Sequence, residues 1–147
     1  MKPILLTAIL TAATATAGVA SAEEWNAFSR NARLVYLADV SAIATVGDTT
    51  SVRVARVPVQ SPQGDYSHKI DEYEFRCRAK QARITVEIEY GPDGVEVERY
   101  PEADAAWDAI RANSLSAFIQ PLVCDGDRAD GPNASSIKAF IDGGRGQ

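Results

Sequence analysis

Two cysteines and one histidine are the residues of this sequence best suited to covalent or metal chemistry. They are Cys77, in the stretch YEFRCRAK, together with Cys124 and His68. A thiol nucleophile needs a base such as histidine, and a structural zinc site needs about four ligands. His68 is the only histidine, and its polar surroundings, DYSHK, predict an exposed loop or strand edge. The sequence therefore predicts no catalytic residues and no metal site.

The N-terminus predicts that the chain is exported. Lys2 provides a short positive region, residues 4–15 are apolar or small, and Ala20-Ser21-Ala22 has the pattern of a signal-peptidase site. We expect residues 1–22 to be a signal peptide, because a membrane span needs about 20 strongly apolar residues. No cysteine lies at the predicted cleavage site, so we expect neither a lipid anchor nor a transmembrane span in the mature chain.

Export favours a structural role for the cysteines. Both lie in the mature part of the chain, and the compartments outside the inner membrane favour oxidation of thiols. The sequence therefore predicts a disulfide between Cys77 and Cys124. The loop that it closes, 124 − 77 = 47 residues, makes the bond worth about 4 kcal/mol by chain entropy.

The charge of the mature chain excludes some classes of partner and function. Loss of Lys2 leaves 14 basic and 20 acidic residues, a formal charge of 14 − 20 = −6. Without a basic tract, nucleic-acid binding is not expected. Residues 125–131, DGDRADG, do not fit the spacing of a calcium loop. Because the chain also has no G-x-S-x-G motif and no phosphate-binding loop, we expect a non-enzymatic protein without a cofactor.

Alternation of apolar and polar residues predicts a sheet over the first two thirds of the mature chain. The predicted strands are residues 33–39, 43–46, 50–59, 70–80, 84–90 and a segment that begins at residue 95. Pro58 predicts that the end of its strand lies at an edge. In residues 70–80, Tyr73, Phe75, Cys77 and Ala79 share one face, and the other face contains Glu72, Glu74, Arg76, Arg78 and Lys80.

The clearest hairpin in the sequence turns at Gly91-Pro92-Asp93-Gly94. A four-residue loop would place Glu89 opposite Glu96 and Glu87 opposite Glu98, which is unfavourable for like charges. We expect the basic stripe of the preceding strand to neutralise them. That stripe consists of Arg76, Arg78 and Lys80.

After Pro101 the apolar spacing changes to the period of a helix. One apolar stripe includes Ala103, Ala106, Trp107 and Ile110, and a second runs from Leu115 to Val123. We expect a helix to begin near Leu115, capped by Asn113 or Ser114, with a break at Pro121 that turns Cys124 toward the sheet. A shorter helix, residues 135–141, is predicted in the tail, with Asn133 or Ser135 as its cap and Gly143-Gly144 at its end.

These elements predict one α+β domain, residues 23–125, followed by a polar tail, residues 126–147. Its fold would be a single antiparallel sheet of about six strands with a C-terminal helix packed on one face and tethered by the disulfide. The predicted core comprises Trp25, Val35, Leu37, Val54, Phe75, Ile84, Val86, Ile88, Trp107, Leu115, Phe118 and Leu122.

The order of short motifs resembles the surface-adhesin protein E family of Gram-negative bacteria. The motifs are Trp25, Asp39-Val40-Ser41-Ala42-Ile43, Val52-x-Val54, Glu74-Phe75-Arg76-Cys77, Arg83, Tyr90 before the Gly94 turn, Trp107, Ser114 and Val123-Cys124. The resemblance covers about residues 25–124. It implies an antiparallel sheet with a C-terminal helix, a disulfide between a strand and the helix end, and adhesion to extracellular macromolecules. The founding members are lipid-anchored, whereas this chain has no cysteine at its predicted cleavage site.

Two functions are compatible with these features. The first is an adhesin-like protein, secreted or at the cell surface, that binds a protein or another macromolecule. The second is a soluble periplasmic module that binds a small ligand or has a structural role in the envelope. The sequence assigns no binding residues to either function.

Overall fold

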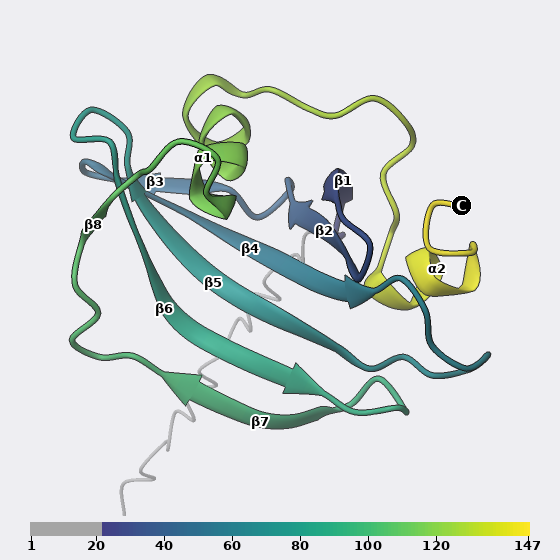
Figure 1. Cartoon of the computed structure of the whole chain (residues 1–147). Helices are drawn as coiled ribbons and strands as arrows, with labels where there is room; N and C mark the ends of the chain where they lie inside the picture. Colours follow the sequence, from purple (N-terminus) through teal and green to yellow (C-terminus); the bar gives the residue numbers. More distant parts are fainter. Residues whose placement is uncertain (1–21) are drawn as a thin grey trace, which may run out of the picture.

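The computed structural model describes residues 22–147, so the predicted signal peptide lies outside the described residues except for Ala22. The chain forms one antiparallel sheet in the order β1-β2-β4-β5-β6-β7, with β3 beside β4 and β8 beside β6 (Figure 1). The strands are β1 Trp25–Arg30, β2 Leu34–Asp39, β3 Ala44–Val46, β4 Thr49–Pro58, β5 His68–Arg76, β6 Gln81–Tyr90, β7 Glu96–Pro101 and β8 Asp108–Ala109. The predicted α+β class and antiparallel sheet are confirmed.

The sheet has an apolar core on each face, because neighbouring residues of a strand point to opposite sides. Val54 of β4 belongs to a cluster with Ile119 of α1 (Leu115–Gln120) and Leu122 of η1 (Pro121–Asp125). The next residue, Ala55, belongs to a second cluster with Ile137 of α2 (Ile137–Asp142). The two C-terminal helical segments therefore pack on opposite faces of the sheet.

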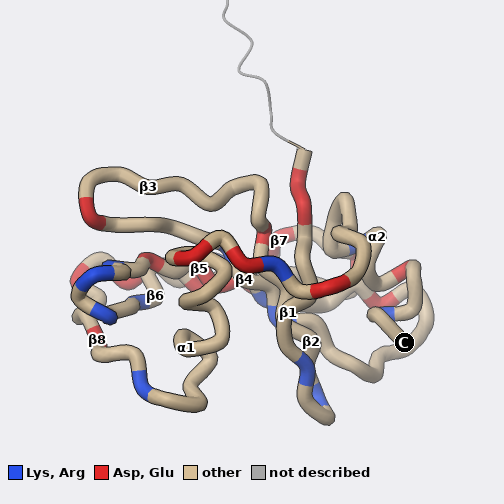
Figure 2. Tube along the Cα trace, turned by 90° about the horizontal axis from the view of Figure 1, so that it is seen from above, with Lys and Arg blue, Asp and Glu red and all other residues tan. Residues whose placement is uncertain are grey.

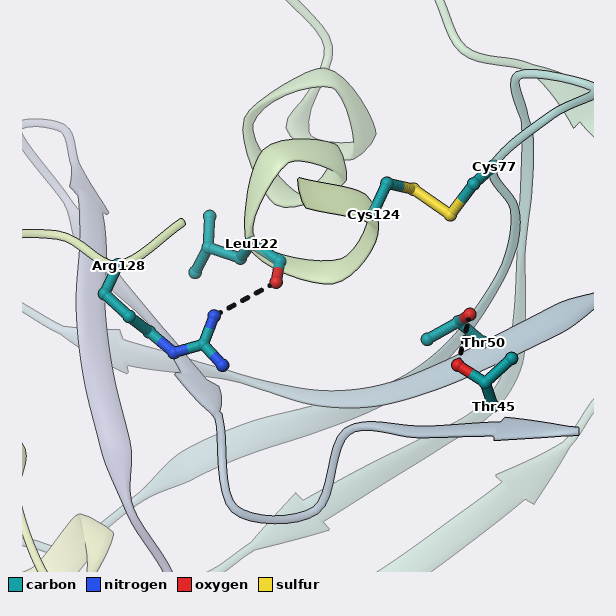
Figure 3. The surroundings of a disulfide bond; sticks show 6 residues. All are labelled: Thr45, Thr50, Cys77, Leu122, Cys124 and Arg128. Atoms are coloured by element: carbon teal, nitrogen blue, oxygen red, sulfur yellow. Dashed lines mark hydrogen bonds between the residues drawn. A yellow bond between two sulfur atoms is a disulfide. The ribbon is translucent and has the colours of Figure 1, made fainter. Parts of the chain in front are cut away.

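The disulfide fastens the first helical segment to the sheet (Figure 3). Ser114 caps α1 by accepting a hydrogen bond from the backbone N–H of Ala117 at 3.2 Å. At Pro121 the α-helix changes to the π-helical turn η1, because proline has no N–H to continue the α-helical pattern. Cys124 therefore lies next to Cys77, with a Cα–Cα distance of 5.7 Å, and the two form the disulfide. The predicted cap, break and disulfide are confirmed.

Residues 103–110 do not form the predicted helix. Residues 103–104 form a turn, residues 105–107 are irregular, and β8 pairs with the start of β6. The side chain of Trp107 lies between two guanidinium groups, with the Arg76 carbon 4.1 Å and the Arg83 carbon 4.4 Å from its ring centroid. These cation–π contacts fix Trp107 against the sheet, so the helical spacing of apolar residues in this segment does not produce a helix.

Two strand predictions are also corrected. The strand predicted over residues 70–80 ends at Arg76, and a turn from Cys77 to Lys80 follows, with Lys80 at φ 51°. Pro58 ends a central strand rather than an edge strand. It is opposite Leu34 of β2, but it lies beyond Arg56, the last β4 residue paired with β5. A missing N–H at that place interrupts no β4–β5 hydrogen bond.

The predicted core is largely buried, with five exceptions. Ile84 and Phe118 are exposed, by 38% and 52% respectively, and Val86, Trp107 and Leu115 are half-buried. Ile84 is opposite Tyr73, on the face that α1 and η1 cover only in part. Phe118 lies beside the buried Ile119 on α1, and so on a side of the helix turned away from the sheet.

Residues 126–147 are part of the packed domain. Trp25 and Ala134 exchange two backbone hydrogen bonds, of 2.9 and 3.0 Å, and the Asn26 amide holds the backbone of Ala129. The helix in this segment begins after Ser136, whose hydroxyl caps it, rather than after the predicted Asn133 or Ser135. Its residue Ile137 packs in the cluster that contains Trp25. No helix in residues 22–147 is long and apolar enough to cross a membrane.

Candidate functional site

The histidine is buried, against the prediction of an exposed loop or strand edge. His68 is the first residue of β5 and is 9% exposed. Its Nδ1–H donates a hydrogen bond to the carbonyl of Tyr66 at 2.7 Å, and its ring stacks on Tyr90 at 4.3 Å. Burial lowers the pKa of His68, so the neutral ring is favoured. Among residues 22–147, no three histidine, cysteine or acidic side chains are grouped to hold a metal ion.

The strongest candidate for a functional surface is the part of the α1 face that no helix covers. Cross-strand register places Tyr36, Arg56, Lys69, Glu89 and Glu98 in one row across five strands. The next row, toward α1, contains Val54, Asp71, Glu87 and Tyr100. Because Val54 packs under α1 and η1, both rows lie on that face. We call their polar residues the open half-face: Tyr36, Arg56, Lys69, Asp71, Glu87, Glu89, Glu98 and Tyr100. Figure 1 shows β4 to β7 without a helix in front of them below α1.

A network of ion pairs organises the open half-face. The Arg56 guanidinium contacts the carboxylates of Asp71, at 2.7 Å, and Glu87. The Lys69 ammonium contacts Glu87 at 2.9 Å, and also Glu89. The hydrogen bond from Lys69 and the contacts with Arg56 lower the pKa of Glu87. This network links charged side chains of β4, β5 and β6 across the open half-face.

Asp71 is the unusual member of the network because it is only 2% exposed. Burial raises the pKa of its carboxyl, and the nearby Arg56 opposes that effect. Nε of Arg56 is buried without a hydrogen-bond partner among the described residues. Burying an ion pair costs free energy that its attraction only partly offsets. A surface that retains such a pair is a candidate for function as well as for stability.

Two predictions for the hairpin are wrong: its strand register and the neutralisation of its glutamates by the basic residues at the end of the preceding strand. Glu89 lies opposite Glu98, and Glu87 lies opposite Tyr100, because the loop has five residues instead of four and a bulge at Glu89/Tyr90 shifts the pairing by one more residue. The glutamates are neutralised from β4 and β5 by Arg56 and Lys69. On the opposite face, the acidic residues Glu72 and Glu74 of β5 also pair across strands, with Arg99 and Arg83 respectively. Glu74 contacts Arg83 at 2.7 Å.

Negative charge is concentrated along β6, β7 and the segment that follows. Residues 87–108 contain eight acidic residues and one basic residue, Arg99, a formal charge of −7. The whole chain has a formal charge of only −5. Within the described part, Glu98, Glu102, Asp104 and Asp108 make no ion pair. Figure 2 marks the acidic and basic positions along the chain.

An apolar groove adjoins the open half-face on the side of α1. It has a volume of about 360 Å³, and its apolar wall includes Tyr73, Ala82, Ile84, Ala105 and Ile110. Its charged lining consists of Glu102, Asp108 and Arg83, and Arg83 forms an ion pair with Glu74 of β5. Tyr73 and Ile84 are paired across β5 and β6 next to the row that contains Asp71 and Glu87, so the groove and the charged network share one face.

A second cavity lies at the other end of the open half-face. It has a volume of about 390 Å³, and Leu34, Pro58, Arg56, Lys69 and Glu89 contribute to its lining. The two apolar residues come from the paired ends of β2 and β4. The cavity therefore combines an apolar wall with charged groups of the network.

The predicted site residues and the open half-face are separate. Cys77 and Cys124 form the disulfide, and the remaining candidate residues come from positions that the sequence did not single out. Asp71 could have been found by alternation, because it shares a strand face with Tyr73 and Phe75 and is therefore an acid on the apolar side.

Comparison with known proteins adds no homologue: no family model, curated protein or solved structure matches the chain.

Proposed function

We propose that this protein is an exported, non-enzymatic binding protein that attaches to a macromolecule outside the inner membrane through the open half-face. The observation that carries the proposal is a part of the sheet that no helix covers, next to a helix that a disulfide fastens to the sheet. Tyr36 and Tyr100 lie on this surface beside its charged side chains. Tyrosine and arginine are enriched where proteins bind each other. The resemblance to the surface-adhesin protein E family supports the same class of function.

The location of the protein is part of the proposal. The signal-peptide pattern and the disulfide support export from the cytoplasm of a Gram-negative bacterium. The absence of a cysteine at the predicted cleavage site favours the periplasm or secretion over a lipid-anchored state. Protease added to intact cells distinguishes these locations: a surface protein is digested, whereas a periplasmic protein is protected until the outer membrane is opened. Full protection in intact cells would end the adhesin version of the proposal.

The binding function is tested by capture from envelope and extracellular-matrix extracts on immobilised protein. We expect wild-type protein to retain a discrete macromolecule that a Tyr36→Ser/Tyr100→Ser variant loses. A matched control, Val46→Ser/Val95→Ser, changes two exposed side chains outside the open half-face, one at the end of β3 and one in the loop before β7, and should retain it. Equal capture by both variants would show that binding occurs elsewhere, and no capture by the wild type would overturn the macromolecular function.

A second candidate function is binding of a small ligand, and the cavity beside Leu34 and Pro58 favours it. Its volume of about 390 Å³ is within the range of small-molecule sites. Native mass spectrometry of protein purified from its own compartment would then show a bound molecule. A Leu34→Trp variant, which fills the cavity, should lose that molecule and keep any macromolecular partner. A wild-type protein that carries no adduct would contradict this alternative.

A further inference from the structure

The acidic side of the open half-face indicates which partner chemistry fits it. Arg56 and Lys69 are already engaged by Asp71, Glu87 and Glu89. The carboxylates farther toward β7 and β8, those of Glu98, Glu102 and Asp108, have no cationic partner in the described part. The uncompensated charge of this surface is therefore negative, and opposite charges steer and orient a partner.

The apolar groove adds a second requirement. Ile84 is 38% exposed at the groove, in the part of β6 between its pairing with β7 and its pairing with β8, and burying such a side chain against a partner removes apolar area from water. Tyr73 lines the same groove and is nearly fully buried, and its hydroxyl makes no hydrogen bond within residues 22–147. Glu102 and Asp108 place negative charge next to this apolar wall, and the charge of Arg83, which also lines the groove, is compensated by Glu74.

We propose that the open half-face and its groove bind a basic segment of a partner protein that presents an apolar side chain between lysine or arginine residues. The apolar side chain lies in the groove against Ile84, and the flanking cations meet Glu102, Asp108 and Glu98. This inference rests on the proposed binding function and adds the chemistry of the partner to it.

Other occupants fit less well. A second copy that used the same surface would bring the carboxylates of Glu98, Glu102 and Asp108, which are unpaired among the described residues, together from two chains, and like charges oppose such a contact. Nucleic acids and acidic polymers are excluded by the same charge. An uncharged apolar peptide would leave the carboxylates of Glu102 and Asp108 without compensation next to a desolvated contact.

The test uses three labelled peptides of roughly ten residues, a length that spans several strands of the sheet. One alternates lysine with leucine, the second alternates lysine with serine, and the third alternates glutamate with leucine. We expect the lysine–leucine peptide to bind the mature protein about tenfold more tightly than the lysine–serine peptide, because a leucine is buried. The glutamate–leucine peptide should not bind. Equal binding of the two leucine peptides would overturn the proposal.

Two pairs of variants separate this site from the general negative charge. Glu102→Gln/Asp108→Asn should weaken binding of the lysine–leucine peptide about fivefold. Asp127→Asn/Asp130→Asn, with the same change in net charge in the linker before α2, should change it less than twofold. Ile84→Ser should reduce the affinity to that of the lysine–serine peptide, whereas Val46→Ser, at an exposed apolar position on β3, should not. If the site variant and its control lose affinity equally in either pair, the peptide is attracted nonspecifically and the proposed site is refuted.

The outcome for this inference is distinguishable from that of the binding function. Melting temperatures of all four variants show whether any of them is misfolded. If a captured macromolecule depends on Tyr36 and Tyr100 but not on Glu102, Asp108 or Ile84, the binding function stands and the basic-segment proposal fails. If no macromolecule is captured and the peptides do not bind, both fail.

Discussion

The Cys77–Cys124 disulfide should make the largest single contribution to stability in the described part of the protein. It links the turn after β5 to the end of η1 and closes a loop of 47 residues. Chain entropy assigns about 4 kcal/mol to a loop of that length. A chain of about 125 residues, the length of residues 23–147, loses roughly 4 °C of melting temperature per kcal/mol, so removing the bond should lower the melting temperature by about 15 °C.

The assay is thermal and urea unfolding of the mature wild-type protein and of Cys77→Ser/Cys124→Ser. The double variant leaves no free thiol that could form a wrong disulfide. Ser also keeps the side-chain size close to that of Cys, so that the core around Leu122 and Ile119 stays filled. The wild type under reducing conditions is the control and should melt near the variant.

The part of the protein that loses stability is as informative as the size of the change in melting temperature. Hydrogen exchange in α1 and η1 should accelerate more than exchange in β4 and β5, because only the helical segments lose their covalent attachment to the sheet. A double variant that melts within 3 °C of the oxidised wild type would refute the assigned role. Uniform acceleration of exchange across sheet and helices would show that the bond acts only on the unfolded chain.

Three further perturbations test the packing around the site. Arg56→Met should lower the free energy of unfolding by about 3 kcal/mol in urea titrations, because Asp71 remains buried without its cation; adding Asp71→Leu should restore most of it, and no recovery would contradict the pairing. The lowered pKa of His68 means that the unfolded chain binds a proton more readily below about pH 6.5. The free energy of unfolding should therefore fall between pH 7.5 and 5.5, and a His68→Gln variant that shows the same fall would exclude this cause. Trp107→Ala removes both cation–π contacts and should cost about 1 kcal/mol, measured by urea unfolding; exchange in residues 102–110 that stays at the wild-type rate would refute the stacking role.

Local chemistry in the sequence was sufficient to predict much of the fold. Alternation located the central strands, Ser114 and Pro121 marked the start and end of α1, and the two cysteines gave the disulfide. These features depend on the residue itself or on its near neighbours. They are therefore readable without knowledge of which strands pair.

The failures involve contacts between distant segments. The spacing of Trp107 is helical, but the ring lies between Arg76 and Arg83 of other strands. A bulge at Glu89/Tyr90 changed which glutamates face each other. Neither effect is visible in a local pattern.

The open half-face was missed for a related reason. Its cross-strand rows exist only because β2, which precedes β4, and β7, which follows β6, extend the sheet on both sides. The acidity of residues 87–108 is present in the sequence, but its position beside an uncovered face and an apolar groove is not. Asp71 is the exception, since its place on the apolar side of β5 follows from alternation alone.

The central claim is that the protein binds a macromolecule through the open half-face. It is tested most directly by site-specific photo-crosslinking in living cells, with a photoreactive phenylalanine analogue at Tyr100 and, as control, at Val46. Both positions are exposed, but only Tyr100 belongs to the open half-face. We predict a discrete adduct of higher mass from Tyr100 and none from Val46. Adducts from both positions, or from Val46 alone, would contradict the claim.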